Sequence, residues 1–297
     1  MTLLKACPLC GNKRFSPIMQ CKDHTASKEM FNIVSCETCS FTMTNPRPNS
    51  EELAKYYDSE MYISHTNSSK GIFNWTYQKI RNYAITQKIA LLKKETAKGS
   101  HLDIGCGTGE FLNACKKAGF KAKGVEPSEK ARNKAIANYG LPISKDPSLL
   151  QYKDSEFDSI SMWHSLEHIT ELNDTILQIN RILKPNGKLI IAVPNHKSWD
   201  AKYYKENWAA WDVPIHFWHF SKETITLLLK KQNLQHRRTK PMIFDSFYVS
   251  LLSEEFSSGK KNLLKAVVIG IVSNLFGALT SRGYSSMIYI FKKKHPF

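Results

Sequence analysis

A chain of 297 residues with 42% hydrophobic residues is long enough for one α/β domain plus a small module, and its composition is that of a globular protein. Its 42 Lys and Arg residues outnumber its 26 Asp and Glu residues, and the resulting net charge of +16 favours anionic partners such as nucleic acid, acidic lipid or phosphorylated substrate. The N-terminus has no apolar run long enough for a signal peptide, and two CxxC pairs suit metal better than disulfides, so we expect a cytoplasmic protein.

Two CxxC pairs lie in residues 1–48, a segment rich in cysteine, lysine and turn residues. The turn in each pair points two sulfurs at one place, and two such pairs complete a tetrahedral Zn²⁺ site. So short a segment buries too little apolar surface to fold alone, and a structural metal would stabilise it by roughly 10 kcal/mol or more. We therefore predict a zinc-ribbon-like module at residues 1–48. Its ligands are Cys7, Cys10, Cys36 and Cys39.

Two other residues of this segment are alternative ligands. Cys21 and His24 have a similar spacing and could replace one ligand, although four thiolates already close a structural site. In the plainer alternative, the four cysteines are reduced thiols in loops. Cys106 and Cys115, further along the chain, are predicted to be small buried residues.

A helical lead-in is predicted for residues 49–95. The stiff segment from Asn45 to Pro48 ends the first module. Ser50 then suits a helix N-cap, because acidic residues follow it in the first turn, and the helix runs to about Tyr57. A second stretch with helical apolar periodicity spans about residues 75–94.

Strands and helices alternate from about residue 96 onward. Such alternation predicts an α/β fold with a parallel, doubly wound sheet, and it places ligands at the carboxyl ends of the strands. Ser221 is the expected N-cap of the last of these helices. The predicted strands are 101–105, 121–126, 157–163, 187–193, 235–240 and 285–291, and the predicted helices are 109–118, 128–138, 171–183 and 221–232.

A glycine loop between the first strand and helix of this domain predicts a nucleotide-cofactor site. Gly105, Gly107 and Gly109 allow a tight turn and a close approach of the backbone to a ligand at a helix N-terminus. Asp103 would repel a pyrophosphate but suits a cationic ligand with an amino group, such as S-adenosylmethionine. Glu126, about 20 residues beyond the loop, can accept hydrogen bonds from both ribose hydroxyls.

With these residues the chain resembles the class I S-adenosylmethionine-dependent methyltransferases, and the segments 157–168 and 183–193 are similar to the family's fourth and fifth strands with their turns. A Trp-His-x-Leu-Glu-His run, followed by Pro-x-His-x-x-His-Phe-Ser from Pro214 to Ser221, resembles the branch that holds ubiquinone-type O-methyltransferases. The resemblance implies a Rossmann-like, seven-stranded, mostly parallel sheet with an antiparallel C-terminal strand in residues 96–297.

His164, Glu167 and His168 form a second candidate site. At spacings i, i+3 and i+4, a helical turn would point all three from one face near the cofactor, as a metal or acid/base group in which His168 is catalytic. The arrangement resembles the Glu-x-x-Glu-His metal segment of some O-methyltransferases, but His164 replaces its first Glu. Alternatively, Glu167 and His168 brace the turn by hydrogen bonds, and His164 contacts the cofactor through its backbone.

An acceptor-binding insertion is expected at about residues 195–220, where methyltransferases of this type place it. The aromatic residues between Trp208 and Phe220 either line an acceptor pocket or hold the loop on the sheet as core residues. His216 and His219 are candidate catalytic residues, because a neutral imidazole near the methyl sulfur can take a proton from a hydroxyl acceptor. His219 is the first choice for this general base.

A strongly apolar helix is predicted at about residues 262–280. It is shorter than a membrane-spanning helix and is interrupted by Lys265 and Asn274. Because basic residues flank it, it could lie on an anionic bilayer or line a lipophilic tunnel, but a helix packed on the sheet is the favoured interpretation.

These features together predict a methyltransferase that uses S-adenosylmethionine, carries a structural zinc and modifies a small-molecule, lipid-like or glycan-precursor acceptor, with O-methylation favoured. One alternative is an rRNA base methyltransferase, because some of these enzymes also have an N-terminal zinc module and the chain is basic. The segment after the fourth strand lacks the Asn/Asp-Pro-Pro-aromatic run of adenine amino-methylating enzymes. Another alternative is a non-catalytic, cofactor-binding scaffold. The sequence leaves the oligomeric state open.

Overall fold

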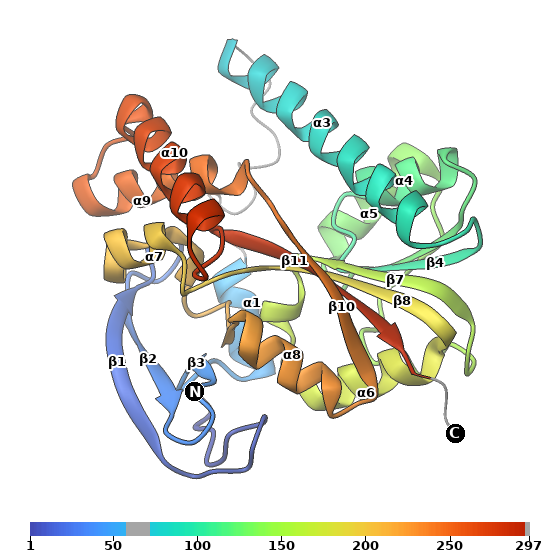
Figure 1. Cartoon of the computed structure of the whole chain (residues 1–297), viewed down its shortest axis with the longest axis horizontal. Helices are drawn as coiled ribbons and strands as arrows, with labels where there is room; N and C mark the ends of the chain where they lie inside the picture. Colours follow the sequence, from blue (N-terminus) through green and yellow to red (C-terminus); the bar gives the residue numbers. More distant parts are fainter. Residues whose placement is uncertain (58–71, 295–297) are drawn as a thin grey trace.

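A seven-stranded sheet forms the centre of the molecule (Figure 1). Its strands are β4 (Ser100–Ile104), β5 (Lys121–Val125), β6 (Ile143–Ser144), β7 (Phe157–Trp163), β8 (Leu183–Pro194), β10 (Leu234–Pro241) and β11 (Ser286–Lys293). In this computed structural model, which describes residues 1–57 and 72–294, their order is β10-β11-β8-β7-β4-β5-β6. Five strands are parallel, and β11 runs antiparallel to both β8 and β10. The predicted Rossmann-like fold is confirmed.

The side chains of β8 alternate between two halves of the core. Leu189, Ile191 and Val193 belong to one apolar cluster with residues of two helices, α6 and α8, while Ile190 and Ala192 belong to another with residues of α3 and α4. This period of two is expected of a strand covered on both faces. The helices are α3 (Ile72–Glu95), α4 (Glu110–Lys117), α5 (Glu129–Tyr139), α6 (Leu172–Ile182) and α8 (Lys222–Lys230).

Side-chain caps set where several helices begin. Ser221 caps α8 as predicted, in a reciprocal pair with Thr224. The helix α1 (Ser50–Tyr57) begins one residue earlier than the predicted cap implies, because Asn49 rather than Ser50 is its cap. The amide oxygen of Asn49 accepts a hydrogen bond from the backbone N–H of Glu52, and the Glu52 carboxylate accepts one from the backbone N–H of Asn49.

The N-terminal segment forms a second, smaller sheet. Its strands are β1 (Phe15–Lys22), β2 (Met30–Cys36), β3 (Thr42–Thr44) and β9 (Trp218–His219), in that order. The fourth strand therefore comes from the 195–220 insertion, and β3 pairs Met43 with Trp218. Phe41 and Met43 share one apolar cluster with Phe220 and Leu229. The predicted module at residues 1–48 thus packs against the larger domain as part of one core.

Three helices and three short 3-10 turns complete the described structure. The α10 helix lies beside α9 and α7 (Figure 1). Within residues 1–57 and 72–294, no helix is both long enough and apolar enough to cross a membrane. The helices are α7 (Trp199–Tyr204), α9 (Asp245–Ser258) and α10 (Leu263–Leu279), and the turns are η1 (Leu166–His168), η2 (Lys205–Asn207) and η3 (Ala209–Trp211).

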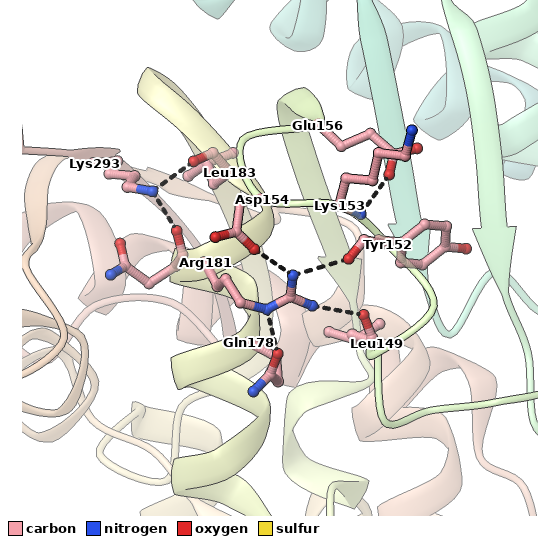
Figure 2. Close-up of polar contacts among 10 residues, drawn as sticks. Leu149, Tyr152, Lys153, Asp154, Glu156, Gln178, Arg181, Leu183 and Lys293 are labelled. Carbon is pink, nitrogen blue, oxygen red and sulfur yellow. Dashed lines mark hydrogen bonds and ion pairs between the residues drawn. The ribbon is translucent and has the colours of Figure 1, made fainter.

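Arg181 fastens the end of α6 to the loop before β7, as Figure 2 shows. Its guanidinium donates to the backbone carbonyls of Tyr152, at 2.9 Å, and Leu149, at 3.1 Å. It also contacts the Asp154 carboxylate at 2.7 Å, but that side chain is 78% exposed, so this ion pair adds little stability. The bonds to the two carbonyls are the larger contribution, because those groups are otherwise removed from water.

Replacing Arg181 with alanine should lower the free energy of unfolding by roughly 1–3 kcal/mol, because the Tyr152 carbonyl loses the guanidinium as donor and the Leu149 carbonyl keeps only the backbone N–H of Tyr152. Urea denaturation measures this change, with exposed Lys130→Ala as the control, for which a change within about 0.5 kcal/mol is expected. Equal stability of the two variants would show that water replaces the guanidinium without loss.

Candidate functional site

The predicted glycine loop lies between β4 and α4, and all three glycines have positive φ angles. A Cβ atom on Gly105 would lie 2.5 Å from that of Ser165, and one on Gly109 would lie 2.8 Å from that of Ala135. Any other residue at these two positions would therefore displace its neighbours. Around Gly107 nothing lies within 4 Å of such an atom, so the middle of the loop faces open space that a ligand can occupy.

Glu126 follows β5 and holds the glycine loop. Its carboxylate accepts hydrogen bonds from the backbone N–H groups of Gly107, at 2.8 Å, and Ser128, at 2.9 Å. Burial raises the pKa of Glu126, although these two donors oppose the shift. A carboxylate has about four acceptor positions, so two remain for the hydroxyls of a ribose.

Asp103, near the end of β4, is buried next to the same loop. The Ser161 hydroxyl donates to its carboxylate at 2.5 Å. Burial raises the pKa of Asp103 to about 7, and both Ser161 and the nearby ammonium of Lys88 act against this rise. Lys88, on α3, lies 4.4 Å above the Trp163 ring. A buried carboxylate beside the loop suits a ligand with a positive charge, so Asp103, Glu126 and the glycines fit S-adenosylmethionine.

His164 directly follows β7 and lies in the left-handed region, with φ of 53°. Its Nε2 lies 2.9 Å from Asp245 on α9, and its Nδ1 lies 3.4 Å from Glu167. Burial would lower the pKa of His164, but these two carboxylates outweigh it and raise the pKa to about 10. The imidazole is therefore a cation at neutral pH, shared between two acids. Asp245 carried no recognisable motif in the sequence.

Glu167, His168 and His216 come together although 48 residues separate the last two in the chain. Each offers a ligand atom, and these atoms lie within 4.8 Å of one another. Glu167 is fully buried, and apart from the ion pair with His164 its carboxylate oxygens accept no hydrogen bond from the described residues. The sequence analysis places Glu167 and His168 in one candidate site with His164. His216 joins them because the 195–220 insertion folds back over η1.

Backbone carbonyls fix the tautomers of both histidines. Nδ1 of His168 lies 3.1 Å from the carbonyl of Ile215, and Nδ1 of His216 lies 2.9 Å from that of Ala210. A carbonyl oxygen can only accept, so each Nδ1 carries the proton and each Nε2 keeps its lone pair. Burial lowers the pKa of His168 to about 4, with His216 adding to the shift. Both imidazoles are thus neutral donors of electron pairs beside a buried carboxylate.

His219 lies on β9, inside the smaller sheet, and is buried. Its Nε2 is 3.0 Å from the Thr44 hydroxyl, which itself donates to the carbonyl of His216. Thr44 therefore accepts from His219, and Nε2 carries a proton. Burial holds the pKa of His219 well below 6.5, so it takes up a proton poorly. These contacts weaken the interpretation of His219 as the general base.

Three tryptophans of the insertion, between residues 208 and 218, are buried and hydrogen-bonded within the protein. Trp208 donates to Asp200 at 2.8 Å, and Trp218 donates to the carbonyl of Ile169 at 2.6 Å. Trp211 donates to the carbonyl of Lys205 at 2.8 Å. They hold the insertion on the sheet, which is the core role that the sequence had left open.

The four predicted zinc ligands meet at one point of the N-terminal segment. The sulfurs of Cys7 and Cys39 are 3.6 Å apart, and those of Cys10 and Cys36 are 3.4 Å apart. A tetrahedral zinc site with Zn–S bonds of 2.3 Å needs sulfurs about 3.8 Å apart, so this arrangement fits the ion closely. Cys21 and His24 lie outside this group of four.

The sequence profile of a family described as a methyltransferase domain matches residues 77–238, more than half of the chain. A sterol 4-C-methyltransferase of Caenorhabditis elegans is 29% identical over 155 residues, which cover 47% of this chain and 46% of that protein. A ubiquinone biosynthesis O-methyltransferase of Coxiella burnetii is 30% identical over 163 residues, covering 52% and 66%. The chain thus spans about half the length of the first of these relatives and under two thirds of the second.

Solved structures agree on the fold. An S-adenosylmethionine-dependent methyltransferase from Archaeoglobus fulgidus superposes with a TM-score of 0.52 and 22% identity, over 75% of this chain and 100% of that one. Phosphoethanolamine N-methyltransferase 2 of Haemonchus contortus, in complex with S-adenosylmethionine, gives a TM-score of 0.50 and 19% identity, over 71% and 53%. At this identity the likeness shows a shared fold.

Proposed function

Because the chain belongs to the class I S-adenosylmethionine-dependent methyltransferase family, we propose that it moves a methyl group from this cofactor to a hydroxyl of a small acceptor, lipid-like or glycan-derived in character. The observation that supports O-methylation is the cluster of Glu167, His168 and His216, which follows β7 beside the cofactor loop. Ser165, in the same turn, donates to the carbonyl of Ile104 at 2.8 Å and so ties the turn to that loop.

The cofactor, when bound, supplies an already activated methyl group, so the protein must chiefly orient the acceptor and remove its proton. Glu126 and the glycine loop would hold the ribose side, and Asp103 the amino group. His168 and His216 present neutral Nε2 lone pairs at the same end of the sheet, where they can receive the hydroxyl proton or orient the hydroxyl.

The donor set of this cluster also fits a divalent cation. Two imidazole nitrogens and a carboxylate are ligands that zinc and other transition metals accept. In metal sites, a ligating histidine usually donates its other ring N–H to a carbonyl or carboxylate, and both histidines here donate to backbone carbonyls in this way. Asp212, whose carboxylate lies 3.7 Å from Nε2 of His216, adds negative charge. A cation there would lower the pKa of an acceptor hydroxyl. In the Glu-x-x-Glu-His metal segment that this turn resembles, the first Glu is a metal ligand. His164 occupies that position here and carries a positive charge instead.

Labelled S-adenosylmethionine with extract of the source cells tests the function. Label is expected in the lipid or small-molecule fraction, as a base-stable ether, while label on RNA bases would support the rRNA alternative instead. Absence of label from every fraction, with intact binding of S-adenosylhomocysteine, would favour the scaffold alternative.

We also propose that Cys7, Cys10, Cys36 and Cys39 hold one structural zinc ion. The close approach of four sulfurs from two loops supports this proposal, because the same sulfurs without a metal would gain little from being brought together. Since Cys7 and Cys36 belong to the main apolar cluster, the ion would stabilise more than its own loop.

The double variant Cys36→Ser, Cys39→Ser should lose one equivalent of zinc and become sensitive to protease across the first fifty residues. Because β9 completes the N-terminal sheet, we expect the 195–220 insertion to become sensitive too. Elemental analysis and limited proteolysis with mass spectrometry measure both effects, and Cys115→Ser serves as the control that keeps its zinc. Wild-type protein without zinc, yet resistant to protease, would contradict the proposal.

A further inference from the structure

The outward side of α10 is covered by large aliphatic residues. They repeat at the helical spacing, and each is between 37% and 83% exposed. Soluble monomers rarely expose a continuous apolar patch of this kind unless it contacts something. We call this surface the α10 apolar face. It consists of Leu263, Leu264, Val267, Val268, Ile271, Leu275 and Leu279.

The inward side of the same helix carries small residues and is firmly held. A Cβ atom on Gly270 would lie 2.5 Å from the Phe247 ring, so α9 and α10 are in close contact there. Ser273 is buried and donates to Asp200 on α7 at 2.7 Å. A rotation of α10 that buried its aliphatic side chains would break the hydrogen bond from Ser273 to Asp200. It would also place a larger side chain than Gly270 against Phe247 of α9. The exposure of the α10 apolar face is therefore built into the fold.

Two further exposed apolar residues, Ile243 and Phe244, lie directly before α9, and the Ile243 carbonyl accepts a hydrogen bond from Asn274 of α10 at 2.9 Å. Phe244 is 43% exposed and lies edge-on to Tyr83 of α3, with ring centroids 5.6 Å apart. The next residue, Asp245, is the partner of His164. Figure 1 shows α9 and α10 side by side at one end of the molecule. The segment that precedes α9 thus connects the α10 apolar face to the Asp245–His164 pair of the candidate site.

The charges at both ends of α10 have one sign. Lys260 and Lys261 precede the helix, Lys265 lies in its first turn, and Arg282 follows its end, while residues 262–282 contain no acid. Lys261 and Lys265 pair with acids of α9. Lys260 and Arg282 are exposed and form no ion pair with any residue that the structure describes. An occupant must therefore be apolar in its middle and negative at its borders.

A second copy of this chain does not meet that requirement. A twofold axis would set the unpaired Lys260 of one copy against either Arg282 or Lys260 of the other, and like charges would face each other in both cases. An anionic bilayer does meet it, because acyl chains accept the aliphatic residues and headgroups accept the cations. With 17 residues, α10 is about 25 Å long, shorter than the roughly 30 Å of a hydrocarbon core.

We propose that the α10 apolar face docks this protein on the surface of an anionic membrane, with the helix in the plane of the headgroups. Lys260 and Arg282 then contact lipid phosphates at either end. The proposal goes beyond methyl transfer and does not depend on which acceptor is methylated.

Flotation of the full chain with unilamellar vesicles tests this inference without an activity assay. Vesicles of phosphatidylcholine with 30% phosphatidylglycerol should bind the protein at least tenfold more tightly than pure phosphatidylcholine, and 1 M NaCl should weaken the binding. Equal binding to both vesicles, or binding to neither, would overturn the proposal.

Two sets of variants identify the surface. Val268→Ser with Ile271→Ser should reduce binding to anionic vesicles at least tenfold, while Leu150→Ser, at an even more exposed aliphatic residue elsewhere, should leave it unchanged. Lys260→Ala with Arg282→Ala should also reduce it roughly tenfold or more. Each variant should keep the wild-type affinity for S-adenosylhomocysteine, which shows that it is folded. A dimer in light scattering that only the α10 substitutions dissociate would overturn the proposal in favour of a second copy.

Discussion

Replacing Glu126 with alanine should weaken the binding of S-adenosylhomocysteine roughly 10- to 150-fold, the equivalent of about 1.5–3 kcal/mol for hydrogen bonds to a charged acceptor. Two causes are expected, because in the proposed site the carboxylate would accept the ribose hydroxyls, and it already accepts hydrogen bonds from the backbone N–H groups of Gly107 and Ser128. Isothermal calorimetry measures the dissociation constant directly.

Glu129→Ala is the matched control for this experiment. Glu129 lies three residues further on, at the exposed start of α5. Its removal changes the net charge equally, so its dissociation constant should stay within a factor of two or three of the wild-type value. If Glu126→Ala binds as tightly as this control, Glu126 does not belong to the cofactor site.

Replacing Glu167 with glutamine should lower methyl transfer roughly 10²- to 10⁴-fold, while the affinity for S-adenosylhomocysteine changes by no more than a few-fold. The amide has the same shape but no charge, so His168 and His216 lose the carboxylate that completes their cluster. Transfer of label from S-adenosylmethionine to the accepting fraction of the extract measures the first quantity. Titration with Mn²⁺ measures whether the cluster holds a cation.

His219→Ala is the comparison that separates the two candidate bases. Because Nε2 of His219 already donates to Thr44, we expect this variant to keep most of its methyl transfer. A loss of transfer in His219→Ala but not in Glu167→Gln would restore His219 as the base. Wild-type activity that survives a chelator too weak to remove thiolate-bound zinc would exclude the cation while leaving His168 and His216 as direct proton acceptors.

The sequence predicted those helices and strands whose position depends on interactions between residues close together in the chain. The strand Phe157–Trp163 and the cap at Ser221 agree with the structure, because a continuous apolar run and a capping hydroxyl act over a few residues. The cap of α1 was wrong by one residue, since Asn49 and Ser50 are both good caps and only the backbone geometry chooses between them. The predicted strand at 187–193 also proved too short, because β8 begins at Leu183.

The candidate site was only partly predictable, because its members meet through tertiary contacts. His164, Glu167 and His168 are neighbours in one turn and could be grouped from their spacing. His216 and Asp245 join them from the insertion and from α9, and no local pattern connects those segments to β7. The same limit applies to His219, whose hydrogen-bond partner Thr44 is 175 residues away and could not be identified from local sequence.

The pairing of β3 with β9 also sets a condition on synthesis. The first three strands of the small sheet leave the ribosome early, but the strand that covers the edge of β3 follows about 175 residues later. At translation rates of 5–20 residues per second, that edge stays unpaired for roughly 10–35 s. Exposed strand edges are sites of non-native association, so the nascent chain needs early protection there.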